Sequence, residues 1–225
     1  MDDSTAMILN HMFKNKKIDA TNISVLDKDR CKTKLASWNY SYEEFFKRRD
    51  FTDEDKGKIL LSLLLEGVSV KSIFEFLDWK GFEIIITSLF DELGYSVLSN
   101  FRFKDEFTRY EIDVIAFNYP YLFLIDCKYY SNPSSSIMKD AALKQKERTE
   151  VIYEMFPILS RELIKKLALP LKREFRLYPL IISWKDHNIQ FSSGVPVIPF
   201  NKLSGFLQEI DEYRDGLFNI PLLMI

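Results

Sequence analysis

The apolar and polar positions of the first third of the chain predict helices. Ser41 with Glu44, and Thr52 with Asp55, have the spacing of capping boxes, in which each side chain bonds the backbone N–H of the other residue. The first pair stands ahead of the segment FFKRR, and the second stands ahead of KGKILLSLLLE. Residues 1–78 are therefore expected to form a helical N-terminal region.

A glycine-containing turn is expected within this region. Gly67 ends one predicted helix, and Ser69 can cap the next, VKSIFEFL. Two short helices joined in this way suit a helix-turn-helix that reads DNA, a dimerisation element, or a helical hairpin packed on the main domain. The hairpin is the plainer interpretation, and the sequence leaves the role of residues 1–78 open.

The segment 79–103 predicts one helix followed by one strand. Gly94 stands where a glycine just past the last helical residue would end the helix, and YSVLSNFRF is then expected to be extended. The predicted core stripe of this helix consists of Phe82, Ile85, Ile86, Leu89 and Leu93.

Residues 111–128, EIDVIAFNYPYLFLIDCK, predict a β-hairpin with its turn at NYPY. In this register the numbers of opposite residues add to 239, so Asp113 faces Asp126 and Glu111 faces Lys128. Residues directly opposite share a face of the sheet, so the four charged side chains are expected on one face. The other face is expected to be core, made of Ile112, Val114, Ala116, Phe123, Ile125 and Cys127.

The rest of the chain continues the alternation of helices and strands. YSNPSSS, residues 130–136, is expected to be a loop, and a helix should follow over about residues 138–156. EFRLYPLIISW and GVPVIPF predict two strands, and Asn201 is expected to cap a final helix, KLSGFLQEI. The tail LFNIPLLMI is either a core segment or an interface. The fold class is therefore α/β with a mixed sheet, and residues 79–225 are expected to be the main domain.

Composition narrows the class of protein. The chain has 225 residues, of which 47% are hydrophobic and 28% charged, which suits a folded domain with a core. Cys31 and Cys127 form neither a disulfide framework nor a set of metal ligands. No signal peptide and no apolar run of membrane length is recognised, so a cytoplasmic location without a membrane partner is expected.

Charge is distributed unevenly along the chain. The net charge is −2, yet residues 10–49 hold ten Lys and Arg against five Asp and Glu. Residues 137–176 hold ten against six. Such basic zones suit a surface that faces phosphates, and they equally suit solvated helix faces.

The acids of the hairpin need a partner. Two carboxylates about 5 Å apart repel each other, and burial increases the cost. Protonation of one acid, neutralisation by Lys128, or a divalent cation between the acids would each relieve the repulsion. Clustered carboxylates suit Mg²⁺ or Mn²⁺, and a lysine beside such a metal stabilises charge that develops on a phosphate. A structural salt-bridge cluster is the alternative.

These residues resemble the PD-(D/E)XK nuclease superfamily, whose restriction-endonuclease-like fold has an αβββαβ core. The superfamily pattern is an acid on the first helix, an acid on the second strand, and (D/E)-x-K on the third strand. Glu83, Asp113 and Asp126-Cys127-Lys128 match this pattern, and the resemblance covers about residues 79–210. The chain looks most similar to the archaeal Holliday-junction-resolvase and Mrr-like branches. Position 126 holds Asp where Glu is commoner.

The resemblance implies roles for the matching residues. Glu83, Asp113 and Asp126 would be catalytic and would ligate Mg²⁺, or alternatively Mn²⁺. The backbone carbonyl of Cys127 would be a further metal ligand. Lys128 would act on the attacking water and on the scissile phosphate.

Substrate contacts are expected from the next helix and from the strands. Gln145 and Arg148 lie three residues apart on one helix face, so both would meet the substrate backbone. Arg102 and Arg109 are further candidates for substrate binding. Glu111 is expected to pair with Lys128 or Arg109.

The function that follows from the resemblance is a metal-dependent DNA endonuclease of repair, recombination or restriction. Three points remain open at this stage: the preferred DNA structure, the choice between DNA and RNA, and the assembly of a homodimer. The main alternative is a nucleic-acid-binding module that has the fold and does not cut.

Overall fold

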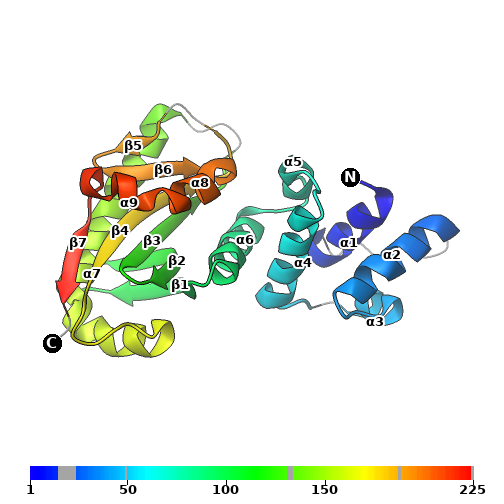
Figure 1. The fold of residues 1–225 in the computed structure, drawn as a ribbon, viewed down its shortest axis with the longest axis horizontal. Helices are drawn as coiled ribbons and strands as arrows, with labels where there is room; N and C mark the ends of the chain where they lie inside the picture. The colour runs from blue at the N-terminus through cyan, green and yellow to red at the C-terminus, as the bar shows by residue number, and fades with distance from the viewer. Residues whose placement is uncertain (15–23, 49, 131–133, 187–188, 224–225) are drawn as a thin grey trace. The chain divides into compact units, whose positions relative to one another are not determined.

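The computed structural model describes residues 1–14, 24–48, 50–130, 134–186 and 189–223 (Figure 1). The chain divides into two compact units, an N-terminal unit of Met1–Leu89 and a C-terminal unit of Phe90–Ile225. Each unit is described by itself. The predicted domain boundary after residue 78 stays a prediction, and residues 131–133 of the predicted loop lie outside the described residues.

The N-terminal unit is helical, as its sequence predicts. Its helices pack around apolar side chains that are fully buried, such as Leu35, Phe45 and Leu60. Its described helices are α1 (Asp3–Lys14), α2 (Val25–Ser37), α3 (Tyr42–Lys47), α4 (Asp53–Leu65), α5 (Val70–Phe74) and the larger part of α6 (Trp79–Glu92).

The caps of these helices follow the sequence closely. Thr52 and Asp55 form a complete capping box at the start of α4. Ser41 and Ser69 accept backbone N–H bonds at the starts of α3 and α5. Gly67 has a φ of 82°, the left-handed conformation in which glycine is least strained, and it follows the end of α4. The helix-turn-helix interpretation stays a prediction, and its would-be second helix, α5, has five residues.

The helix α6 confirms most of its predicted stripe. Phe82, Ile85 and Ile86 are fully buried. Leu93 is 44% exposed, so its predicted place in the core is wrong. The helix ends at Glu92, and Gly94 has a φ of 82°, so the chain has already turned toward the next strand at Leu93.

The C-terminal unit is built on a mixed seven-stranded sheet, which confirms the predicted fold class. The strand order is β1-β2-β3-β4-β6-β5, and β7 also pairs with β4. The β3–β4 and β4–β6 pairs are parallel, and the other pairs are antiparallel. The strands are β1 (Ser96–Lys104), β2 (Arg109–Asn118), β3 (Tyr121–Lys128), β4 (Glu174–Ser183), β5 (Phe191–Ser192), β6 (Val195–Pro199) and β7 (Ile220–Leu223).

The predicted hairpin register is confirmed. Val114 pairs with Ile125 and Asn118 with Tyr121, so opposite numbers add to 239. The paired ladder ends at Val114 and Ile125, one pair short of the two acids. Beyond this point β2 pairs only with β1, and β3 continues beside β4.

Both faces of the hairpin are packed, which corrects the expectation of one chemical and one apolar face. Ile115, Leu122 and Leu124 belong to a buried cluster with Ile152 and Phe156 of α7 (Ser135–Leu167). On the other face, the ring of Phe123 lies 6.1 Å from that of Phe90 in α6. The acids therefore stand at the end of an apolar face.

The helix α7 is longer than predicted. It begins after the cap Ser134 and continues through Pro157 to Leu167. Proline in a helix interior removes one backbone hydrogen bond, which is why the sequence suggests an end near residue 156. Leu163 and Leu167 are buried in the same cluster as Phe156, and this packing keeps the last turns helical.

The C-terminal segments agree with the sequence except at one cap. β4 and β6 are the two predicted strands. Asn201 lies inside a short 3₁₀ helix, Phe200–Lys202, and α8 (Leu203–Gln208) begins without a side-chain cap, so the predicted cap is wrong. The tail forms β7 against β4, and its last two residues lie outside the described ones. In the described part of the chain, no helix combines the length and the apolar character that crossing a membrane needs.

Candidate active site

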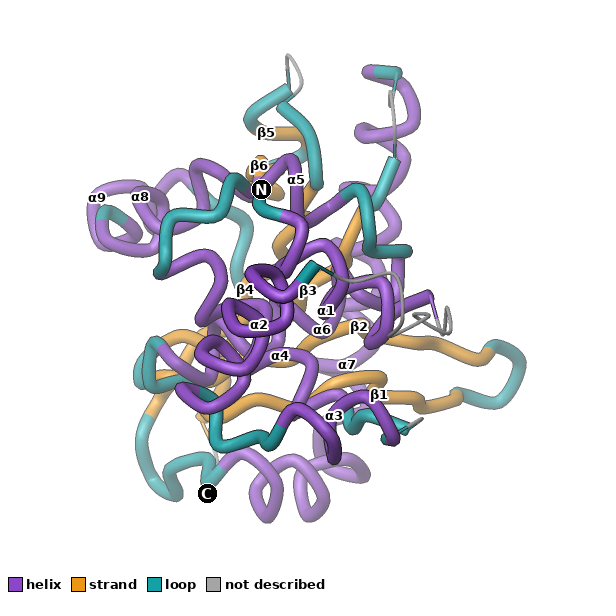
Figure 2. Tube along the Cα trace, turned by 90° about the vertical axis from the view of Figure 1, so that its right-hand side faces the viewer, coloured by secondary structure: helices purple, strands orange, loops and turns teal. Residues whose placement is uncertain are grey.

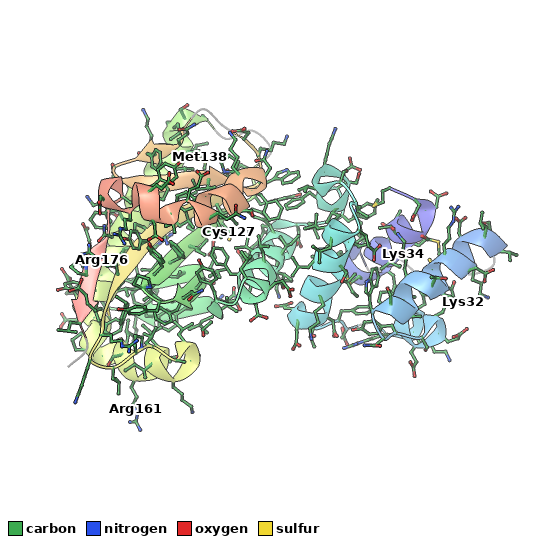
Figure 3. All side chains as sticks on the ribbon, viewed as in Figure 1. Lys32, Lys34, Cys127, Met138, Arg161 and Arg176 are labelled. Carbon is green, nitrogen blue, oxygen red and sulfur yellow. The ribbon has the colours of Figure 1, made fainter. Side chains whose placement is uncertain are left out.

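The hairpin acids and the lysine come together where β2 parts from β3. Asp126 and Lys128 lie at the C-terminal end of β3, and Asp126 is only 4% exposed. The side chain of Asp113 accepts a hydrogen bond of 2.7 Å from the backbone N–H of Cys127, whose position is labelled in Figure 3. Beyond the end of the β2–β3 ladder, the Asp113 carboxylate is thus the acceptor for the backbone N–H of Cys127.

Two cations hold the Asp126 carboxylate. Lys128 Nζ lies 2.6 Å from Oδ2, and Arg148 Nη1 of α7 lies 3.1 Å from Oδ1. The first contact is an ion pair, and the buried Oδ2 accepts no hydrogen bond. A buried carboxylate is stable here because two positive charges compensate for its lost hydration.

Burial and charge shift the proton affinity of this group. Burial, together with the nearby charge of Asp126, raises the pKa of Asp113 from 3.8 to about 6. The Cys127 N–H, Lys128 and Arg148 act in the opposite direction. Burial lowers the pKa of Lys128, but the charges of Asp126 and other neighbours outweigh it, so the pKa is raised overall. The site therefore disfavours a negative charge on Asp113 beside Asp126, and it favours the charged form of Lys128.

Gln145 is a buried neighbour of Arg148. Its side chain is fully buried, and its Nε2 donates a 2.7 Å hydrogen bond to the carbonyl of Leu124. Its Oε1 accepts a 3.0 Å bond from Arg148 Nη1. Gln145 therefore orients Arg148, and the predicted contacts of both residues with a substrate stay predictions.

Glu83 lies on α6 and is buried, with 8% exposure. Its backbone carbonyl accepts the hydroxyl of Thr87. It belongs to the N-terminal unit, so its part as a third acid of the site stays a prediction.

Glu111 pairs with neither of its expected partners. Arg102 Nη2 lies 3.0 Å from Glu111 Oε1, and the two residues are opposite each other on β1 and β2. Lys128 is engaged by Asp126. Arg109 faces Lys104 near the tip of the β1–β2 hairpin. Glu111 therefore belongs to the surface of this hairpin.

The donors present fit a hard divalent cation with few protein ligands. Asp113 and Asp126 supply two carboxylates, and the part of the Cys127 carbonyl as a further ligand stays a prediction. Among the described residues no group of three His, Cys, Asp or Glu side chains gathers around a common point. Mg²⁺ is commonly held by one or two carboxylates, with waters and substrate phosphates as the other ligands. The buried Oδ2 of Asp126 has an ion pair with Lys128 and no hydrogen bond, and it is the oxygen that such an ion would bind.

An aromatic pair stands beside this site, and the sequence did not indicate that Trp184 belongs to it. Lys128 is in register with Ser183 of β4, and the N–H of Trp184 donates to the Lys128 carbonyl. The rings of Tyr129 and Trp184 stack with centroids 6.3 Å apart. The sequence signal was the two parallel strands, whose carboxyl ends meet at one edge of a sheet.

Comparison with known proteins agrees with the geometry. Residues 78–176 match the family model of the nuclease-related domain, NERD, which belongs to the PD-(D/E)XK-like nuclease fold. The match contains the hairpin acids, Lys128, Gln145 and Arg148, and it indicates a nuclease-related function. The assignment to a resolvase or Mrr-like branch stays a prediction.

Individual relatives add little about activity. An uncharacterized protein of Archaeoglobus fulgidus is 27% identical over 135 residues, which are 60% of this chain and 93% of the relative. The crystal structure of AF1548, a protein of unknown function, covers 63% of this chain and 79% of its own, with 18% identity and a TM-score of 0.33. Protein VC1899 from Vibrio cholerae covers 96% of this chain and 58% of its own, with 12% identity and a TM-score of 0.38.

Proposed function

We propose that this chain is a metal-dependent endonuclease that hydrolyses phosphodiester bonds in DNA. The observation that carries the proposal is the convergence of Asp113, Asp126 and Lys128 at the point where β2 leaves β3. Two acids and a lysine in one partly buried corner match the needs of phosphodiester hydrolysis, in which negative charge builds on the phosphate.

The role that we propose for each residue follows from its charge. A bound Mg²⁺ would polarise the phosphate and lower the pKa of a bound water. Asp113 and Asp126 would hold that ion, and Lys128 would stabilise the charge on the phosphate oxygens. Arg148, oriented by Gln145, would contact a neighbouring phosphate or hold Asp126 in place.

A non-catalytic binding module is the second candidate. One observation favours it: Lys128 and Arg148 already occupy both oxygens of Asp126. The described residues also offer no third side-chain ligand at this point. A domain that only binds nucleic acid would keep these cations and have no need of the metal.

Cleavage of a substrate panel separates the two candidates. The panel contains single-stranded DNA, duplex, flap, four-way junction and a matched RNA, each with EDTA, Mg²⁺ or Mn²⁺. The variants are Asp113→Asn, Asp126→Asn and Lys128→Ala. Glu212→Gln is the control, because Glu212 is an exposed acid of the C-terminal unit that belongs neither to the site nor to the β1–β2 hairpin.

The nuclease proposal expects metal-dependent cutting that falls at least about 100-fold in the three site variants and persists in the control. Binding of DNA without cutting under any condition would establish the non-catalytic module. Faster cutting of RNA than of any DNA would redirect the activity to RNA.

A further inference from the structure

The β1–β2 hairpin continues beyond the strand that carries the site. The pairs from Phe101–Ile112 to Lys104–Arg109 join β1 and β2 alone, because the β2–β3 ladder ends at Val114. Figure 2 shows this pair of strands ending in an outer loop. A two-stranded extension therefore leads from the acids into solvent.

The loop at its tip holds one aromatic ring outward. Phe107 is 92% exposed, the highest value among the large apolar side chains of the described residues. Asp105 Oδ1 accepts the N–H groups of Phe107 and Thr108, at 2.8 and 2.6 Å, and Oδ2 accepts the hydroxyl of Tyr110. The loop is thus fixed by its own hydrogen bonds, and the ring is exposed by a defined conformation.

The inner side of the extension is rigid. The ring centroids of the stacked Phe101 and Phe103 lie 5.7 Å apart, and those of the stacked Phe103 and Tyr110 lie 5.1 Å apart. Phe101 and Phe103 belong to the buried cluster that includes Ile152 and Phe156 of α7. The inner side of the hairpin is therefore packed in the same cluster as the long helix, up to Phe103 and Tyr110.

The outer side of the extension is charged. Arg102, Lys104 and Arg109 are exposed there, and Glu111 is paired with Arg102. These residues line an open depression of about 490 Å³. In the loop, Glu106 is also exposed, while the carboxylate of Asp105 is engaged by the loop itself. The apolar and charged sides follow the alternation of the strands, so the cations form a short row beside the ring.

We propose that this hairpin binds the substrate DNA, with Phe107 stacking on an unpaired base and Lys104 and Arg109 contacting phosphates. The inference rests on the proposed function and adds the kind of DNA to it. Arg109 is four residues from Asp113, about 13 Å along a strand, and Phe107 is about 20 Å away. At 3.4 Å per base pair, these lengths place the contacts roughly four to six base pairs from the cleaved bond.

The exposed ring selects for unpaired bases. A base inside a duplex already stacks on both neighbours, so a protein ring gains a partner only where one face of a base is free. Stacking of an aromatic side chain on such a base contributes about 1–3 kcal/mol. The preferred substrate is therefore DNA with a junction between duplex and single strand.

Fluorescence anisotropy of the full chain in EDTA tests this inference without cleavage. The probes are a continuous duplex and a duplex with a single-stranded tail, which carries 2-aminopurine at its first unpaired position. The variants are Phe107→Ala and Phe107→Trp. Phe191→Ala is the matched control, since Phe191 is also an exposed phenylalanine of the C-terminal unit.

Phe107→Ala should weaken binding of the tailed duplex roughly ten-fold and abolish quenching of the 2-aminopurine. Its affinity for the continuous duplex should stay within about two-fold. Phe107→Trp should retain both properties, and Phe191→Ala should behave as the wild type. Lys104→Ala should reduce the slope of log affinity against log salt by roughly 0.7–0.9 on either probe.

Two failures have different meanings. A wild-type chain that binds neither probe and cuts nothing overturns the proposed function together with this inference. A wild-type chain that cuts DNA, with an unchanged Phe107→Ala variant, overturns the hairpin inference alone. The exposed ring would then be assigned to another partner, such as a protein surface.

Discussion

The single residue that best characterises the site is Asp113. Its carboxylate lies at the point where the β2–β3 ladder ends, and it accepts the N–H of Cys127. The hydrogen bond places the group close to Asp126, and the two negative charges oppose each other. Without a bound cation, this arrangement costs stability, because burial and Asp126 raise the pKa of Asp113 to about 6.

The pH dependence of stability in EDTA should reveal this cost. An acid whose pKa is raised by folding binds its proton more tightly in the folded state, so the contribution of Asp113 to wild-type stability should rise as pH falls from about 7 to about 4. Asp113→Asn removes the charge and keeps an acceptor for the Cys127 N–H. The variant should be more stable than the wild type at pH 8, by at most about 3 kcal/mol, and the difference should vanish near pH 4.

Urea denaturation at pH 8, 6 and 4 checks this prediction. Asp140→Asn is the control, because Asp140 is an exposed aspartate on α7. If Asp113→Asn loses stability at pH 8, the carboxylate is a structural salt-bridge member, and the strained pair is the wrong picture.

Gln145 provides the second prediction at this scale. Gln145→Leu keeps the volume of a buried side chain but removes its hydrogen bonds to the Leu124 carbonyl and to Arg148, which keeps its contact with Asp126. The change should cost about 1–3 kcal/mol of unfolding free energy. It should also lower kcat more than it raises KM, because Arg148 loses the hydrogen bond to Gln145 that orients it.

The exposed Gln208→Leu is the matched control, and both variants are compared by urea denaturation and single-turnover cleavage. Loss of stability with an unchanged cleavage rate would make Gln145 a purely structural residue.

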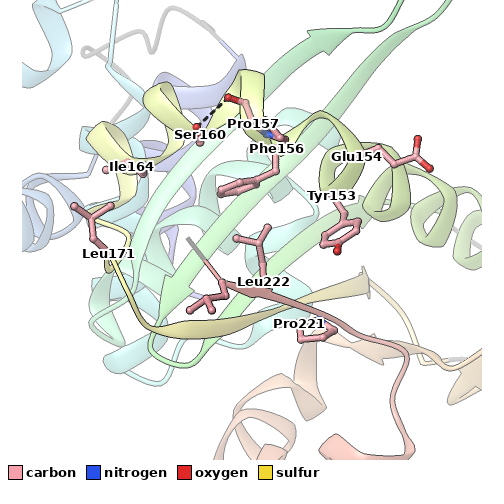
Figure 4. A pocket seen from close by; sticks show the side chains of 10 residues that line it. Tyr153, Glu154, Phe156, Pro157, Ser160, Ile164, Leu171, Pro221 and Leu222 are labelled. Atoms are coloured by element: carbon pink, nitrogen blue, oxygen red, sulfur yellow. Dashed lines mark hydrogen bonds between the residues drawn. The ribbon is translucent and has the colours of Figure 1, made fainter. Parts of the chain in front are cut away.

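At the scale of elements, α7 connects the site with the opposite end of the sheet. Its first turns pack against Ile181 and Val197 through Met138 and Ala142. Its last turns cover the cluster beneath the β1–β2 hairpin. Pro157 interrupts the hydrogen bonding between these two parts, and a cavity of about 570 Å³ opens beside it, lined by residues of α7 and β7 and by Leu171 (Figure 4).

Pro157→Ala should stabilise the protein by about 1–2 kcal/mol. Proline inside a helix costs roughly 3 kcal/mol, and part of this is offset because proline also restricts the unfolded chain. Thermal and urea denaturation measure the change, and Ile158→Ala, at a 77% exposed neighbour, is expected to be nearly neutral. A loss of stability in Pro157→Ala would show that the interruption is required for the packing of Leu163 and Leu167.

The elements themselves were largely predictable. Caps such as the Thr52–Asp55 box and Gly94 are local, so a few neighbouring residues decide them. The exceptions were decided by distant contacts. The helix α7 continues through its proline because its far end is buried, and Asn201 does not act as a cap because a 3₁₀ turn precedes α8.

At the scale of the whole molecule, a bound metal should act on the stability of the folded chain. Any ion that binds only the folded state stabilises it, by about 2.7 kcal/mol when its concentration is 100 times its Kd. Mg²⁺ and Mn²⁺ should therefore raise the Tm of the wild type at pH 8. Asp113→Asn and Asp126→Asn should lose this increase.

Differential scanning fluorimetry across a metal titration provides the measurement. Glu111→Gln should respond as the wild type, because Glu111 pairs with Arg102 away from the site. An equal increase of Tm in all four proteins would place the metal elsewhere on the chain.

The sequence by itself determined most of the elements and the hairpin register, and it selected the candidate site residues, whose roles stay predictions. These follow from periodicity, from turn residues and from a pattern of acids and lysine, all of which act over a few residues. Only the tertiary structure decided where the ladder ends, that Arg148 reaches Asp126, and that Gln145 is buried behind it. Those outcomes depend on which strand lies beside which and on how α7 crosses them, and such long-range contacts leave no local signal in the chain.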